Sequence, residues 1–310
     1  MLQEHAIEAT SRNLPVLRCQ FLPGRFMYDV MTWHISTDAQ RTEWCVDGGC
    51  RAVLSGAWTE AIAGDHGFWI MSNSIEFNEK KQDRVLSDDD WKQIWEARNI
   101  GFHEKNIHPL LSEFLNEMQD GRPKLNIFFP FCGKAVDMKW LADMGHNVVG
   151  VDVCEMALKE FFTDHNIPYT QEAIAGIPGA KVFKSVSGNI ALYCCSIYDL
   201  SHSVTGKFDG IWDRAAMVAV NLKDQERYVN VLLSLMAKDC RCLLVTVEYD
   251  PNLIKGPPFY IPEFDLENLL GPSYTFKHLK KIDALGDLQK QWGLDIYFEN
   301  IYLIMPKMLS

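Results

Sequence analysis

Short apolar runs alternate with helix-like segments from residue 125 onward, and this alternation constrains the fold more than any other feature of the sequence. The first run, residues 125–130, is bounded by turn residues, as a buried strand is. Strands that alternate with helices need crossover connections, which predict an α/β fold with a mostly parallel sheet and helices on both faces. The predicted strands are residues 125–130, 147–151, 190–195, 208–212, 242–247, 274–282 and 296–305.

Two features complete this prediction. Ser87 and Asp90 have the spacing of a capping box, so a helix is expected to begin there, before the sheet. The last two predicted strands follow each other without a long helix between them, so we expect one antiparallel edge strand. The predicted helices after the first are residues 107–118, 135–144, 154–165 and 224–237.

The composition narrows the class of protein. The chain has 310 residues, 47% of them hydrophobic, which is typical of globular proteins and excludes disorder over most of the length. A formal net charge of −11 argues against a nucleic-acid binder and a membrane-surface protein. No apolar run is long enough to span a bilayer. Nine cysteines without a CxxC pair favour free thiols in a reducing cytosol, with no metal site.

The first 70 residues differ from the rest of the chain. They contain no lysine, whereas all 19 lysines lie in residues 71–310. A polar stretch, Ser72-Asn73-Ser74, then follows Met71 and has the character of a flexible protein start. We expect residues 1–70 to be an N-terminal extension, either disordered or a mispredicted leader, and residues 71–310 to form the functional domain. The alternative is a genuine small N-terminal subdomain.

The carboxyl ends of the predicted strands supply a candidate ligand site. Gly133 lies in the turn after the first strand, and Asp152, 19 residues further on, ends the second. The GxGxxG fingerprint of a dinucleotide site is absent, but a glycine turn and a strand-end acid fit a cofactor that has a ribose and no phosphate. S-adenosylmethionine is such a cofactor. The alternative is a plain tight turn and an ordinary acid.

Two further turns are expected at the same edge of the sheet. Ser196 and Ile197 follow the third strand and are candidates to clamp an adenine ring; the alternative is a simple polar loop. Asp213 and Arg214 end the fourth strand and are the candidate catalytic residues. Arg214 is suited to holding a thiolate, an anionic substrate or the cofactor carboxylate. The alternative for Arg214 is a structural salt bridge with Asp213 or another acid.

An aromatic set, Trp91, Trp95 and Phe102, precedes the sheet and is a candidate lid over the ligand, although such a set is more often core. The thiols are expected to pack in the core, and no Cys-His pair indicates a nucleophile. These thiols are Cys132, Cys194 and Cys195.

At this level of detail the chain resembles the thiopurine S-methyltransferase family over residues 87–305. The resemblance implies a Rossmann-like, seven-stranded S-adenosylmethionine-dependent fold with an antiparallel last strand. It also implies S-methylation of aromatic or heterocyclic thiols by a monomer in the cytoplasm. The matching stretches are residues 128–140, 145–151, 181–185, 193–197, 207–214 and 256–260.

The resemblance carries the family's cofactor contacts onto this chain and places Phe102 against the substrate as well. Three departures from the family pattern affect the site. Phe131 replaces an expected Leu, Asp152 replaces a Glu, and Leu288 stands where an Arg is expected near the substrate. The nearby Lys290 is no equal replacement for an Arg fork. The cofactor contacts implied are Trp91, Trp95, Phe102, Phe131, Gly133, Asp152, Ser196, Ile197 and Arg214.

Three hypotheses follow. The first is an S-methyltransferase that moves the methyl group of S-adenosylmethionine to small aromatic thiols. The second is a non-catalytic relative that binds S-adenosylmethionine, or a methyltransferase with a shifted thiol substrate, and Leu288 favours it. The third, a nicotinamide oxidoreductase, is disfavoured by the absent GxGxxG pattern.

Overall fold

The computed structural model describes residues 85–307 in full and, before them, only the backbone of seven short strands. The chain divides into two compact units between Lys80 and Lys81. In the first unit β1–β4 form one antiparallel sheet and β5–β7 another. The expected extension, residues 1–70, lies mostly outside the described residues, so its nature stays a prediction. These strands are β1 (His5–Ile7), β2 (Leu17–Gln20), β3 (Thr32–Ile35), β4 (Thr42–Trp44), β5 (Cys50–Leu54), β6 (Ala57–Ala63) and β7 (Trp69–Met71).

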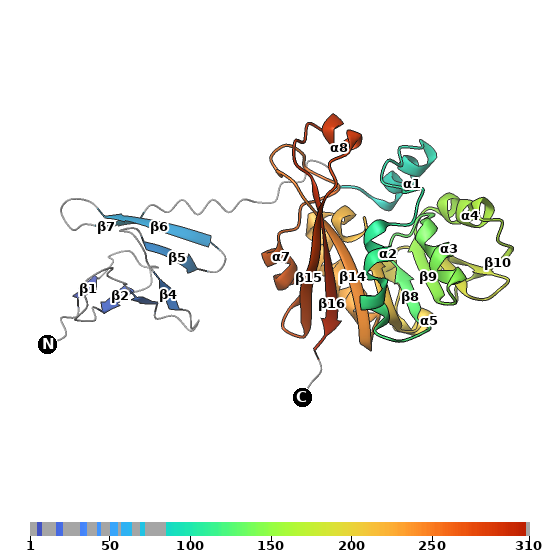
Figure 1. The fold of residues 1–310 in the computed structure, drawn as a ribbon, viewed down its shortest axis with the longest axis horizontal. Helices are drawn as coiled ribbons and strands as arrows, with labels where there is room; N and C mark the ends of the chain where they lie inside the picture. Colours follow the sequence, from blue (N-terminus) through green and yellow to red (C-terminus); the bar gives the residue numbers. More distant parts are fainter. Residues whose placement is uncertain are drawn as a thin grey trace. The chain divides into compact units, whose positions relative to one another are not determined.

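The second unit is built on a nine-stranded sheet with the order β10-β11-β12-β9-β8-β13-β14-β16-β15 (Figure 1). The five central strands, β12 to β14 in this order, pair in parallel, and β16 is antiparallel to both β14 and β15. The predicted α/β class and antiparallel last strand are confirmed. The strands are β8 (Asn126–Phe129), β9 (Asn147–Asp152), β10 (Tyr169–Ala173), β11 (Lys181–Ser185), β12 (Ile190–Cys194), β13 (Phe208–Asp213), β14 (Met236–Glu248), β15 (Tyr274–Asp283) and β16 (Phe298–Pro306).

The predicted count of seven strands is wrong, because β10 and β11 form an additional antiparallel hairpin at one edge of the sheet. Every residue of β10 is exposed, so this strand has no apolar run that a sequence pattern reveals. β11 is only five residues long and carries lysines at both ends of its apolar pair. The sheet therefore has antiparallel pairs at both edges.

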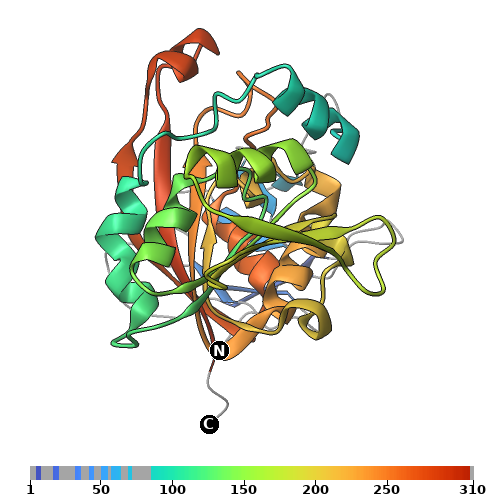
Figure 2. The same cartoon turned by 90° about the vertical axis from the view of Figure 1, so that its right-hand side faces the viewer.

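Helices cover both faces of this sheet, as predicted (Figure 2). One core contains buried side chains of α2, α3 and α4, and the other contains those of α6 and α7. The neighbours Cys194 and Cys195 contact opposite cores, because successive strand side chains alternate between faces. The helices are α1 (Asp88–Glu96), α2 (Pro109–Gln119), α3 (Val136–Asp143), α4 (Glu155–Asp164), α5 (His202–Thr205), α6 (Gln225–Ser234), α7 (Glu263–Leu270) and α8 (Asp287–Gln291), with 3-10 turns η1 (Ile197–Asp199), η2 (Met217–Ala219) and η3 (Leu222–Asp224).

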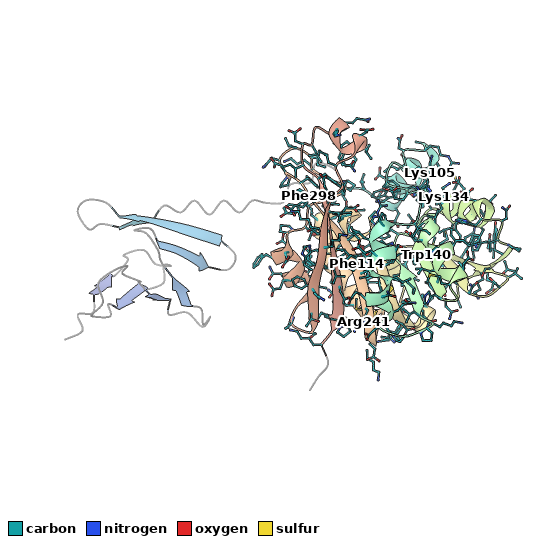
Figure 3. All side chains as sticks on the ribbon, in the orientation of Figure 1. Lys105, Phe114, Lys134, Trp140, Arg241 and Phe298 are labelled. Atoms are coloured by element: carbon teal, nitrogen blue, oxygen red, sulfur yellow. The ribbon has the colours of Figure 1, made fainter. Side chains whose placement is uncertain are left out.

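The helix before the sheet, α1, and the short helix between β15 and β16, α8, lie at one end of the sheet (Figures 1 and 2). The predicted capping box is present, since Ser87 accepts from the amide of Asp90 and the Asp90 carboxylate accepts from the amide of Ser87. α1 and α8 lie at the same end of the sheet in both views (Figures 1 and 2). Lys134, in the turn after β8, lies toward this end, and Arg241, in β14, lies at the other (Figure 3). Within residues 85–307, no helix has the length and apolar character that a membrane span needs.

Candidate active site

The turn after β8 is held by the acid at the end of β9. The amide of Gly133 donates to Oδ2 of Asp152 at 2.8 Å, and the amide of Cys154 donates to Oδ1 at 2.8 Å. Phe131 and Gly133 both have positive φ, 45° and 47°, so the turn is unusually tight. A Cβ atom at Gly133 would lie only 2.6 Å from Cζ2 of Trp95, so the position requires glycine for space as well as for conformation.

The Asp152 carboxylate fits a nucleoside ribose. Burial raises the pKa of Asp152 to about 6, although hydrogen bonds from the backbone amides of Cys154, Gly133 and Val153 act in the opposite direction. A carboxylate has about four lone-pair sites, so these three bonds leave acceptor capacity for one hydroxyl group. The predicted pair, Gly133 and Asp152, is brought together as the sequence spacing indicated.

The loop after β12 lies beside the start of α1. Ile197 is buried in η1, and Ser196 is half-buried just before it. Burial raises the pKa of Asp88 in α1, and the charge of Asp199 in η1 adds to this rise. Arg227 lies 4.0 Å above the ring of Tyr198 in the same turn. The structure thus gathers Ser196 and Ile197 at the same edge as α1.

The three predicted lid aromatics contact one another. The ring of Phe102 makes edge-on contacts with Trp91, at a centroid distance of 6.1 Å, and with Trp95, at 5.7 Å. Trp95 is buried against Cys154 and Ala157, and its ring also covers Gly133. We name α1 and residues 97–106 the cover segment. The aromatic set is both a small core and a cover over the glycine turn.

Asp213 and Arg214 are neighbours in sequence, but their side chains contact different segments of the chain. Asp213 is fully buried and accepts from the amide of Met217 at 2.9 Å and from the hydroxyl of Tyr228 at 2.6 Å. Burial raises its pKa to about 6. These bonds fix the chain that follows β13, so we assign Asp213 a positioning role, and its contact with substrate stays a prediction.

Arg214 is directed to the cover segment. Its Nη1 donates to the carbonyl oxygen of Phe102 at 2.6 Å, and its Nη2 pairs with Oε1 of Glu104 at 3.1 Å. The salt-bridge alternative is therefore observed, with Glu104 as the partner. The same contacts bring Arg214 to Phe102, which was expected to face the substrate.

The departure at Leu288 also falls within this region. A Cβ atom at Gly101 would lie 3.2 Å from Cδ2 of Leu288, so α8 presents this apolar side chain to the cover segment, next to Phe102. Lys290, on the same short helix, is exposed. The residue that replaces the expected Arg is thus adjacent to the predicted substrate contact.

The sequence did not predict two residues that join segments of the site, Glu104 and Asn221. Glu104 pairs with Arg214, and the side-chain amide of Asn221 accepts from the amide of Leu86 at 2.9 Å and donates to its carbonyl at 2.8 Å. Both join segments more than 100 residues apart. No local pattern marks such partners, so one sequence carries no signal that would have found them.

The thiols at this end of the sheet belong to the packing. A Cβ atom at Gly150 would lie 2.6 Å from Sγ of Cys132, and burial raises the pKa of Cys132 well above its usual range. Burial likewise raises the pKa of Cys194 to about 11 and of Cys195 to about 12. None of the three is activated as a thiolate nucleophile. Among the fully described residues, no group of three or more His, Cys, Asp or Glu side chains is arranged to hold a metal ion.

The glycine turn, the strand-end acid and the aromatic cover lie at the carboxyl edge of the parallel sheet, which is where open α/β folds bind their ligands. The fold is similar to that of a solved methyltransferase, 1,6-didemethyltoxoflavin-N1-methyltransferase of Burkholderia thailandensis with S-adenosylhomocysteine bound. The TM-score is 0.50 at 13% identity, covering 83% of this chain and 99% of that chain. The chain thus shares the fold of this methyltransferase.

The sequence comparisons identify the family. Residues 86–307 match the family profile of thiopurine S-methyltransferase. The chain is 48% identical over 229 residues to the thiopurine S-methyltransferase of Rattus norvegicus, covering 74% of this chain and 95% of that protein. It is 47% identical to that of Canis lupus familiaris, covering 74% and 94%. The chain belongs to the thiopurine S-methyltransferase family, as predicted. It is a methyltransferase, and S-adenosylmethionine is its methyl donor.

Proposed function

We propose that this protein transfers the methyl group of S-adenosylmethionine to the sulfur of aromatic or heterocyclic thiols of the thiopurine type. The observation that carries the proposal is the meeting of Gly133, Trp95 and Phe102 at the strand edge where Arg214 points. A donor site and a cationic, aromatic acceptor site thereby share one end of the sheet. Relatives at 47–48% identity bear the name thiopurine S-methyltransferase, which supports the same chemistry here.

The donor side is assigned residue by residue. Asp152 would accept from a ribose hydroxyl, Ser196 and Ile197 would clamp the adenine, and the glycine turn would admit the rest of the donor. When bound, the donor supplies an electrophilic methyl group on a sulfonium centre. The remaining predicted donor contacts are Trp91, Trp95, Phe102, Phe131, Gly133 and Arg214.

The acceptor side has two tasks, orientation and charge stabilisation. Phe102 would orient the ring of the thiol, and the cover segment would exclude water from the reacting sulfur. The Arg214 guanidinium would stabilise the thiolate form by hydrogen bonding and charge. Methyl transfer to a thiolate is an in-line displacement, so alignment to a distance of about 3 Å is the main requirement.

A transfer assay tests this function. Purified protein with radiolabelled S-adenosylmethionine is expected to methylate thiophenol and a heterocyclic thiol such as a mercaptopurine. Asp152→Ala is expected to weaken donor binding, measured by calorimetry, because it removes the ribose acceptor. Donor binding without transfer to any thiol would instead favour a non-catalytic relative.

We propose a monomer acting in the cytoplasm on a small-molecule thiol, with activity residing in residues 71–310 and residues 1–70 as an extension. The family match to residues 86–307 supports this division. Equal kcat/KM for the full chain and for residues 71–310 is the expected result, and a loss of activity on truncation would give the extension a functional role.

A further inference from the structure

The Arg214 guanidinium already donates two hydrogen bonds within the chain. Nη1 donates to the Phe102 carbonyl at 2.6 Å, and Nη2 donates to Glu104 at 3.1 Å. Bidentate binding of a carboxylate needs two parallel N–H groups of one guanidinium. The Arg214 side chain is only 19% exposed, whereas that of Glu104 is 54% exposed. Arg214 keeps further N–H groups, so an incoming carboxylate can still reach it, but that carboxylate would meet the negative charge of Glu104 on the same guanidinium.

Two further acids, the buried Asp137 and the half-buried Glu299, add to the negative charge that acts on Arg214. The amide of His108 donates to Asp137 at 2.8 Å, and Nε2 of His108 lies 3.4 Å from Glu299. The charge of Arg214 acts on both carboxylates and helps to lower the pKa of Glu299 against the effect of burial. Arg214 thus has one direct acidic partner, Glu104, and interacts electrostatically with Asp137 and Glu299 as well.

The neighbouring side chains do not offset this charge. Lys134 is paired with Glu160 and Asp164, each at 2.9 Å. Burial lowers the pKa of His103, which disfavours its cationic form. Leu288 presents methyl groups to Gly101, the residue before Phe102. Phe102, the predicted substrate contact, therefore lies beside the apolar Leu288 and beside Arg214, whose charge is paired with Glu104.

We propose that Glu104 selects the acceptor by charge, so that aromatic thiols bearing a cationic group are favoured over thiols bearing a carboxylate, with uncharged thiols between them. A cationic thiol can exchange partners with the resident ion pair: its thiolate takes an N–H of Arg214, and its ammonium group takes Glu104. A carboxylate gains no such partner and meets like charge. The inference rests on the proposed function and names its substrate class.

Three thiophenols of similar size test it, carrying 4-aminomethyl, 4-ethyl or 4-carboxymethyl groups. The full-length protein is expected to show kcat/KM about tenfold higher for the aminomethyl than for the carboxymethyl thiol, a modest factor because Glu104 is partly exposed. Binding of the three S-methylated products, measured by calorimetry with S-adenosylhomocysteine present, is expected to follow the same order. Equal values, or a preference for the carboxylate in both measurements, would overturn the inference.

Substitution isolates the residue responsible. Glu104→Gln is expected to reduce the preference about tenfold, toward equality, because the amide keeps the shape and loses the charge. The matched control is Glu113→Gln, since Glu113 is another partly exposed acid in an ion pair, with Lys280 at 2.8 Å, and is expected to leave the preference unchanged. Leu288→Arg, a second variant, is expected to raise kcat/KM for the carboxymethyl thiol.

The outcomes separate this inference from the proposed function. If thiols are methylated but Glu104→Gln leaves the order of preference unaltered, the selection by Glu104 is refuted and the thiol chemistry stands. If no thiol is methylated, the proposed function fails, and the order of product binding in the two variants still decides whether Glu104 selects by charge.

Discussion

The two sides of the candidate site are built in different ways. On the donor side, the amide of Gly133 and the side chain of Asp152 are 19 residues apart and are joined by a hydrogen bond at the ends of adjacent strands. On the acceptor side, the Arg214 side chain is joined to the Phe102 carbonyl, which is 112 residues away and lies outside the sheet. Pairing of adjacent strands therefore positions the donor side, whereas a contact between a strand end and a segment outside the sheet positions the acceptor side.

This difference has a consequence for specificity. A side chain can change at Glu104 or Leu288 without disturbing any strand, since Glu104 lies in the cover segment and Leu288 in the short helix α8. A change at Gly133 disturbs the turn that Asp152 holds. Substitutions can thus change the charge of the acceptor side within one fold, while the turn on the donor side stays the same.

The largest effect is expected from Gly133→Ala, which tests whether the donor side depends on the backbone. The added Cβ would lie 2.6 Å from the Trp95 ring, at a φ of 47°. Donor affinity is expected to fall by roughly 100-fold, since moving the indole and straining the turn cost about 3 kcal/mol together. Calorimetry with S-adenosylmethionine measures the loss.

Gly179→Ala is the matched control, because Gly179 also has a positive φ, 78°, but has nothing within 4 Å of its Cβ position. This variant is expected to lose about 1 kcal/mol of stability and to bind the donor normally. Equal donor affinity in Gly133→Ala and Gly179→Ala would show that the contact with Trp95 is unimportant.

The next effect concerns Arg214 and asks to which side of the site it belongs. Arg214→Ala is expected to lower kcat/KM for thiophenol by about 100-fold, because the thiolate loses its charged hydrogen-bond donor. Arg214→Lys keeps the charge but loses the fork, so a loss of about tenfold is expected. Donor affinity is measured in parallel. A fall in donor affinity as large as the fall in kcat/KM would assign Arg214 to the donor side.

The same contrast explains how much the sequence predicts. Gly133, Asp152, and the loop at Ser196 follow from one rule, that parallel strands place their carboxyl ends at one edge. The capping box at Ser87 is equally local, and it is confirmed. The aromatic set before the sheet is also visible in the sequence as a candidate lid, and the ring of Phe102 contacts both tryptophan rings.

The elements that the sequence did not predict lack a local signature. β10 is exposed along its whole length, so burial imposes no pattern on it. Glu104 pairs with Arg214, which is 110 residues away, and Asn221 bonds to Leu86, which is 135 residues away. Such pairs depend on the completed fold, and a charged residue in an exposed loop has many equally plausible partners before the fold is known.

The pH dependence of donor affinity tests the role of Asp152 without a substitution. Burial raises the pKa of Asp152 to about 6, so this carboxylate becomes protonated as the pH falls through 6 and accepts a ribose hydroxyl less well. Donor affinity is expected to be roughly tenfold weaker at pH 5 than at pH 7.5. The sign for stability is opposite, because the folded state holds this proton more tightly than the unfolded state. The contribution of Asp152 to stability is present below pH 4 and is lost as the pH rises through 6.

Asp152→Asn is expected to bind the donor weakly at both pH values, with no response to pH. Asp213 titrates in the same range, with its pKa also raised to about 6, so Asp213→Asn is the necessary control. This control is expected to keep the pH response of donor binding. A response that disappears in Asp213→Asn and persists in Asp152→Asn would reverse the two assignments.

The smallest effect is expected from the loss of Asn221. This side chain binds the backbone of Leu86, two residues before α1 begins at Asp88. The side-chain amide of Asn221 makes two hydrogen bonds to this backbone, at 2.8 and 2.9 Å, and Asn221→Ala removes both. The cover segment should then open more often, so dissociation of S-adenosylhomocysteine is expected to be up to about fivefold faster, as two partly exposed bonds allow. Stopped-flow tryptophan fluorescence reports the rate, because Trp91 and Trp95 lie in α1. The control is Asn230→Ala, on an exposed position of α6. A wild-type dissociation rate in Asn221→Ala would mean that the aromatic contacts alone hold the cover segment over the donor side.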